Sequence, residues 1–151
     1  MIFPNSELRY LRSFRVAHLA TVDYKGNPHL VPIVFAADRK AIYFVVDYKT
    51  KKGRTLRRLK NIRDTRKATV LVDRYSEEWS KLSYMMISCK PVILDEGKSL
   101  GEKKRAALLL RKKYVQYRRD GYFPLGLDRA IFVKLLPQKT LTWKNLHLSV
   151  V

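Results

Sequence analysis

The sequence predicts a mainly β (α+β) fold, in which a six- to seven-stranded antiparallel barrel has helices packed outside it. Three observations predict this class. Apolar runs of strand length follow one another at hairpin spacing, and two longer segments show a helical period instead. The 151 residues are 46% hydrophobic, which suffices for one core. No repeat or Pro/Gly-rich linker divides the chain, so we expect a single domain over residues 1–151.

The first expected element is a short helix over residues 5–15. Asn5 or Ser6 would cap it, since both side chains can accept a hydrogen bond from a free backbone N–H group. Leu8 and Leu11 form its apolar side. This side should pack on the barrel.

Three strands in a meander are expected next, over residues 16–23, 29–37 and 41–47. The turn between the first two contains Gly26, a residue typical of tight turns. Pro32 falls inside the second strand, and because proline cannot donate a ladder hydrogen bond, it indicates an edge strand or a bulge. The strands are apolar on both faces, so helices or a partner chain should cover their outside.

The second half of the chain predicts two longer helices. The first lies within residues 49–64, where Leu56, Leu59 and Ile62 form one apolar stripe among basic residues. The second spans residues 98–119, and its apolar stripe comprises Leu100, Ala107, Leu110, Tyr114 and Tyr117. Gly121, shortly beyond its end, is the expected stop. Four more strands are expected, over residues 68–73, 84–94, 129–136 and 140–146.

The charge balance indicates an anionic partner. The chain has 32 Lys and Arg against 13 Asp and Glu, a net charge of +19, and such an excess repels itself unless anions are present. Eleven of these cations lie between Lys49 and Arg74. One interpretation is a solvated helix face; the other is a binding site for phosphate.

The positions of the basic residues favour the phosphate interpretation. Lys49, Lys51, Lys52 and Arg54 surround the predicted helix start, where the helix dipole disfavours cations by about 0.3–1 kcal/mol each. A bound phosphate would remove this conflict by accepting hydrogen bonds from the helix start, from these side chains and from Thr50 as the N-cap. The sequence therefore predicts a phosphate site at Thr50 to Arg54.

Other classes of site and protein are not expected. The longest apolar stretch, Leu30 to Ala37, has 8 residues, whereas a membrane span needs about 20, and the start lacks the pattern of a signal peptide. We expect a cytoplasmic protein with no membrane partner. The single cysteine, Cys89, and three histidines show no metal-ligand spacing. Cys89 should be inert packing, and Trp79 and Trp143 should lie either in the core or at a ligand groove.

The run from Arg15 to Leu82 resembles the pyridoxamine 5′-phosphate oxidase-like split-barrel family, especially its branch of deazaflavin (coenzyme F420)-dependent enzymes. The matching marks are ATV followed by a turn and GNPHLVP, the strand that ends in Asp47, the basic helix with RLKNI, and TVLVD followed by an acidic loop with Trp79. The residues specific for pyridoxal in the true oxidases are not found. The resemblance covers nearly half of the chain.

The resemblance implies a split β-barrel homodimer that binds FMN or the deazaflavin in a groove between subunits. The family's ring-contacting segment carries over onto six residues of this sequence: His29, Leu30, Val31, Pro32, Ile33 and Val34. Its phosphate contacts carry over onto six more: Lys49, Thr50, Lys51, Lys52, Arg54 and Arg58.

The expected function is that of an oxidoreductase that uses a flavin-type cofactor, F420 or FMN, for hydride transfer to a small-molecule substrate. No nucleophilic or paired-carboxylate constellation is present, and none is needed when the cofactor carries the chemistry, so no catalytic residue is assigned. A carrier of the cofactor without turnover is one alternative. A nucleic-acid binder is another, but nucleic acid is not expected because basic and aromatic residues are not interleaved. The polyanionic tail of F420 would engage more cations than FMN does, which favours F420.

Overall fold

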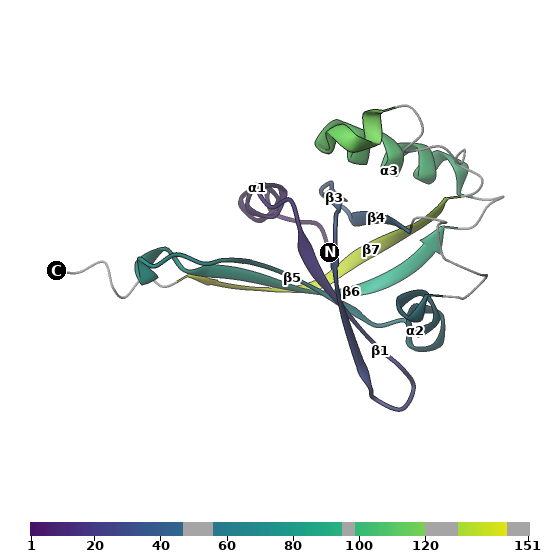
Figure 1. Ribbon diagram of the computed structural model, residues 1–151, viewed down its shortest axis with the longest axis horizontal. Coiled ribbons are helices and arrows are strands. Elements are labelled where there is room, and N and C mark those ends of the chain that lie inside the picture. Colours follow the sequence, from purple (N-terminus) through teal and green to yellow (C-terminus); the bar gives the residue numbers. More distant parts are fainter. Residues whose placement is uncertain (47–55, 95–98, 120–129, 145–151) are drawn as a thin grey trace.

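The computed structural model describes residues 1–46, 56–94, 99–119 and 130–144. Within these ranges, seven strands form one antiparallel sheet in the order β2-β1-β5-β6-β7-β4-β3. The sheet curls into a half-barrel with the helices outside (Figure 1), which confirms the predicted class. In chain order the elements are α1 (Asn5–Arg12), β1 (Ala17–Val22), β2 (Pro28–Ile33), β3 (Ala36–Ala37), β4 (Ile42–Val46), α2 (Arg57–Thr65), β5 (Ala68–Arg74), η2 (Trp79–Lys81), β6 (Ser83–Leu94), α3 (Leu100–Lys113), η3 (Val115–Arg118) and β7 (Ile131–Lys144).

The main core joins the sheet to helices α1 and α2. Leu8 and Leu11 of α1 are buried in it, as are Leu59 and Ile62 of α2, against inward-facing strand residues such as Val70. The apolar sides that the helical period predicted for these two helices are therefore confirmed. Of the helices in the described part of the chain, none is long and apolar enough to cross a membrane.

Helix α3 covers the β3–β4 side of the sheet through a second apolar cluster. Ala107, Leu110 and Tyr114 are buried there, as predicted, whereas Leu100 is 47% exposed, contrary to prediction. The predicted helix over residues 98–119 is also too long, because Tyr114 has extended backbone and the 3₁₀ turn η3 follows it. Gly121, the predicted stop, lies outside the described residues.

The predicted meander of the first three strands is wrong, because the predicted strand over residues 29–37 is divided into β2 and β3. Strand β1 pairs with β2 and β3 pairs with β4, but β2 and β3 occupy opposite edges of the sheet. The physical reason lies at Phe35, between these two strands. Its backbone N–H donates to the hydroxyl of Tyr114 at 3.0 Å and its carbonyl lies 2.8 Å from the same hydroxyl, so a side chain of distant sequence takes the place of a ladder partner.

The predicted N-cap residues of the first two helices are also wrong. Pro4, not Asn5 or Ser6, stands at the N-cap of α1 without a side-chain hydrogen bond; the preceding segment is held instead by the N–H of Phe3, which donates to a backbone carbonyl at 2.8 Å. Helix α2 begins at Arg57 with Leu56 at its N-cap. Thr50 is therefore not the N-cap of this helix.

The two predicted closing strands are one strand, β7. It pairs with β6 along the whole length of β6, and the register shifts between Ser88 and Cys89, opposite Pro137 and Lys139. Pro137 thus lies at an irregularity within one ladder, between the two predicted strands. Together β5, β6, η2 and the end of β7 form an arm that reaches away from the body of the molecule (Figure 1).

Candidate functional site

Strand β2 places the predicted ring-contacting residues on an open edge of the sheet. Within the described residues it pairs only with β1, in unbroken register, so Pro32 marks an edge and not a bulge. Such an edge presents unpaired backbone N–H and C=O groups to a ligand. Of the six side chains, Leu30, Pro32 and Val34 are exposed, His29 and Val31 are half-buried, and Ile33 is buried.

Arg58 is the one predicted phosphate contact that lies in the described residues, and it sits in the first turn of α2. Its side chain is half-buried, and its Nε is buried without a hydrogen-bond acceptor in the part of the chain that the structure describes. Burial lowers the pKa of this guanidinium. A buried cationic donor that lacks an acceptor fits a site for an anion such as the phosphate of a cofactor. The other five, Lys49, Thr50, Lys51, Lys52 and Arg54, lie outside the described residues.

Helix α2 is fixed to β1 by polar side chains. The amide of Asn61, which is buried, donates to Thr21 Oγ1 at 3.1 Å, and the hydroxyl of Thr65 lies 3.1 Å from the carbonyl oxygen of Val22. Because β2 pairs with β1 along its full length, strand β1 contacts both the helix that carries Arg58 and the strand that carries the ring-contacting segment. The buried Oδ1 of Asn61 has no hydrogen-bond donor among the described residues.

A hollow of about 440 Å³ lies over strands β1, β5 and β6. None of the seven predicted residues that the structure describes lines it, although Pro28, directly before His29, does. Its polar lining consists of Thr21, Lys67, Thr69, Ser88 and Gln138. Thr69 and Ser88 are register partners, so these hydroxyls meet only through strand pairing. The sequence contains no local signal for that pairing, so this hollow was not predictable from it.

The described residues around these strands offer little acid–base chemistry. They contain no group of His, Cys, Asp and Glu that could hold a metal ion. Cys89 is 3% exposed, and burial raises the pKa of its thiol to about 12, so it is no nucleophile at neutral pH. The predicted role of Cys89 as packing is confirmed. Trp79 and Trp143 are 59% and 41% exposed, so neither is a core residue.

The sequence profile of the pyridoxamine 5′-phosphate oxidase family matches residues 6–123. The chain belongs to this family. Among solved structures, this family member is similar to the conserved hypothetical protein Rv2991 from Mycobacterium tuberculosis, with 17% identity and a TM-score of 0.73 over 100% of this chain and 91% of that one. No curated protein matches the chain.

Two further structural relatives have names that describe a ligand. A FAD-binding protein from Mesorhizobium loti has 15% identity and a TM-score of 0.67, covering 94% of this chain and 95% of that one. The heme storage protein HutZ from Vibrio cholerae has 13% identity and a TM-score of 0.68, covering 93% of each chain. At these identities the likeness shows the fold of the pyridoxamine 5′-phosphate oxidase family, and ligands differ among proteins that share it.

Proposed function

We propose that this chain is an oxidoreductase that binds a flavin-type cofactor, coenzyme F420 or FMN, and uses it for hydride transfer with a small-molecule substrate. The observation that carries the proposal is the Nε of Arg58, buried without an acceptor among the described residues, in the helix that follows Lys49 to Arg54. A phosphate group would supply the missing acceptor. Membership of the pyridoxamine 5′-phosphate oxidase family supports the same class of cofactor.

Two groups of residues would bind different parts of the cofactor. The exposed edge of β2, His29 to Ile33, and the adjoining Val34 would contact the ring, with unpaired backbone groups as partners for its polar atoms. Arg58, with Lys49, Thr50, Lys51, Lys52 and Arg54, would hold the phosphate. When bound, the cofactor supplies the hydride chemistry, while the protein provides orientation and electrostatics.

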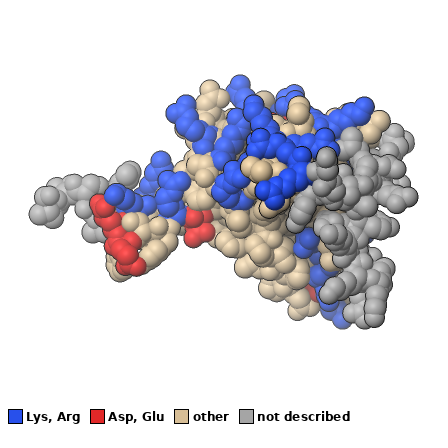
Figure 2. Space-filling model, turned by 45° about the horizontal axis from the view of Figure 1, so that its top comes forward, with Lys and Arg blue, Asp and Glu red and all other residues tan. Residues whose placement is uncertain are grey.

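The excess of cations favours F420 over FMN. The chain has 32 Lys and Arg against 13 Asp and Glu, and a polyanionic tail would neutralise more of them than one phosphate does. Lys and Arg also gather over the part of the surface that α1 and α3 form, whereas acidic side chains lie at the arm (Figure 2). Those cations lie outside the proposed cofactor contacts, so the preference for F420 rests on the cations of residues 49–63. The proposal therefore ranks the deazaflavin first.

A second copy of the chain would complete the cofactor groove. Leu71, Met86 and Leu141 are register neighbours across β5, β6 and β7, so their side chains share one face. Met86 and Leu141 are 38% and 46% exposed. An apolar row of this kind on the outside of a sheet is a surface for another subunit. We include a homodimer in the proposed function.

Charge reversal tests the phosphate contacts. Lys52→Glu should weaken binding of F420 by about 1 kcal/mol or more, the value of one charge-assisted hydrogen bond, in a fluorescence titration. Arg58→Met should weaken it similarly. Lys104→Glu is the matched control, because Lys104 is exposed on α3; Lys103 is unsuitable, since it is 1% exposed. Equal losses at Lys52 and Lys104 would show diffuse attraction and contradict the assigned contacts.

A further inference from the structure

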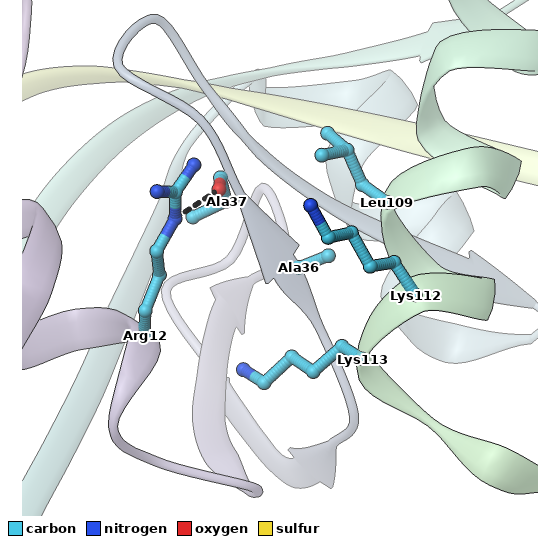
Figure 3. A pocket seen from close by; sticks show the side chains of 6 residues that line it. All are labelled: Arg12, Ala36, Ala37, Leu109, Lys112 and Lys113. Atoms are coloured by element: carbon cyan, nitrogen blue, oxygen red, sulfur yellow. Dashed lines mark hydrogen bonds between the residues drawn. The ribbon is translucent and has the colours of Figure 1, made fainter.

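A hollow of about 240 Å³ lies between α1, β3 and α3. Arg12 enters it from α1 and Lys112 and Lys113 from α3, so cations approach the Ala36–Ala37 strand from both sides (Figure 3). Leu109 and the two alanines give it apolar walls. Strand β3 is at the edge of the sheet opposite β2, and only residues 34 and 35 connect the two strands, so this hollow lies just beyond the end of the proposed ring-contacting segment.

The ammonium group of Lys113 is buried in an unusual environment. Its Nζ has no hydrogen-bond acceptor among the described residues and lies 3.8 Å from the centroid of the Phe35 ring. The ring face offsets part of the cost of burying the charge, but the three N–H donors of an ammonium remain unsatisfied. Burial, together with Arg15 and Arg12, lowers the pKa of Lys113 to about 8, so the group still carries its proton at neutral pH.

The backbone around this hollow holds Arg12 and the neighbour of Lys113 in place. Arg12 Nε donates to the carbonyl oxygen of Ala37 at 2.9 Å, which fixes its guanidinium beside β3. Tyr114, next to Lys113, is anchored through its hydroxyl, which lies 2.7 Å from the carbonyl oxygen of Arg15 and accepts from the N–H of Phe35. The guanidinium of Arg12 is therefore preorganised, and a ligand would meet this cation already in position.

The carboxylates carried by these elements, or next to them, are engaged elsewhere. Glu7 of α1 accepts from the hydroxyl of Thr140 at 3.1 Å. Asp38, which follows β3, accepts from Arg105 and from the N–H groups of residues 40 and 41. Glu102 of α3 forms an ion pair with Lys134 at 3.0 Å. Within the described residues of α1, β3 and α3, no acidic side chain lines the hollow to neutralise its cations.

We propose that this hollow binds a small phosphate monoester, with the phosphate on Arg12, Lys112 and Lys113 and a short apolar body against Leu109. A dianionic group matches three cations that line one hollow better than a single negative charge does. The volume of about 240 Å³ is below the range of about 300–1,000 Å³ for drug-sized ligands, so the body is a few carbon atoms or one ring. The proposal does not depend on the proposed cofactor.

Titration of the full chain with phenyl phosphate and with inorganic phosphate tests the site, read from the methyl NMR signals of Leu109. Phenyl phosphate should bind saturably and more tightly than inorganic phosphate, because only the ester has an apolar body. Lys113→Met keeps an unbranched apolar side chain at this position but removes the ammonium over Phe35, and it should weaken binding about tenfold, as expected for one charge-assisted hydrogen bond. Lys104→Met, exposed on the same helix, should change the affinity less than about twofold.

The outcomes separate this site from the cofactor site. Lys52→Glu should leave the Leu109 response unchanged, and a protein that binds no flavin should still show that response. Equal effects of Lys113→Met and Lys104→Met would show diffuse attraction of anions to the basic surface and overturn the proposal. No saturable response of Leu109 up to about 10 mM phenyl phosphate would also overturn it.

Discussion

The hydroxyl oxygen of Tyr114 lies 3.0 Å from the backbone nitrogen of Phe35 and 2.8 Å from the carbonyl oxygen of the same residue. The two residues are 79 positions apart. Phe35 stands where the chain leaves β2 at one edge of the sheet and enters β3 at the other. The side chain of Tyr114 thus satisfies backbone groups that a continuous strand would have paired, and it links α3 to this crossing.

Tyr114→Phe should therefore destabilise the protein more than removal of a surface hydroxyl. It leaves the buried N–H of Phe35 without its acceptor, which costs about 1–3 kcal/mol. Urea unfolding followed by circular dichroism measures this. Tyr24→Phe is the control, since Tyr24 is 74% exposed, and it should change the free energy of unfolding by less than about 0.5 kcal/mol. Equal stability of the two variants would contradict the structural role of Tyr114.

Lys113 should make stability depend on pH in the alkaline range. Its pKa is about 8 in the folded protein against an ordinary value of 10.5, so between these values the unfolded chain binds more protons. Stability from this group must then rise as pH increases from about 8 toward 10.5. Lys113→Met should lack this increment when unfolding free energies are measured at pH 8 and pH 10. Identical pH profiles of the two proteins would refute the burial of this charge.

Cys89 should resist alkylation in the folded protein. Its thiol is 3% exposed, and burial raises its pKa to about 12, so almost no thiolate is present at pH 8. Mass spectrometry after treatment with iodoacetamide should show labelling only in denaturant. Rapid labelling of the native protein at this pH would mean that β6 opens or that the thiol is accessible.

Met86→Glu should weaken the proposed dimer. Met86 lies in the apolar row with Leu71 and Leu141 on the outside of β5, β6 and β7, and a buried unpaired carboxylate in an interface is costly. Analytical ultracentrifugation at micromolar concentration should show a dimer for the native chain and a monomer for the variant. Leu108→Glu, at a 67% exposed position on α3, should remain dimeric. A native monomer would contradict the shared groove.

Local patterns in the sequence predicted the elements better than their arrangement. Apolar runs located β5 and β6 within one residue, because an apolar run of strand length is a strong local signal. The opposite placement of β2 and β3 was not predictable, since it depends on the contact between Phe35 and Tyr114. The polar lining of the hollow near β2 also depends on residues distant in sequence, because Thr69 and Ser88 meet only through the pairing of β5 with β6.

For the two basic clusters as well, the sequence predicted only part of what the structure shows. Lys112 and Lys113 look like ordinary cations in the last turn of a helix, a position that the helix dipole favours. Nothing local indicates that Lys113 points into the protein over Phe35. The concentration of cations from Lys49 to Arg58 was visible at once, but the helix start assumed for it was wrong, because α2 begins at Arg57.

Competitive titration of the purified full chain with F420 and FMN tests the central claim most directly. Cofactor fluorescence should show saturable binding of both, with F420 displacing FMN, and Arg58→Met should weaken both affinities because it removes the buried donor beside the phosphate. Tight FMN binding without affinity for F420 would reverse the preference. Absence of binding by either cofactor would contradict the proposed function.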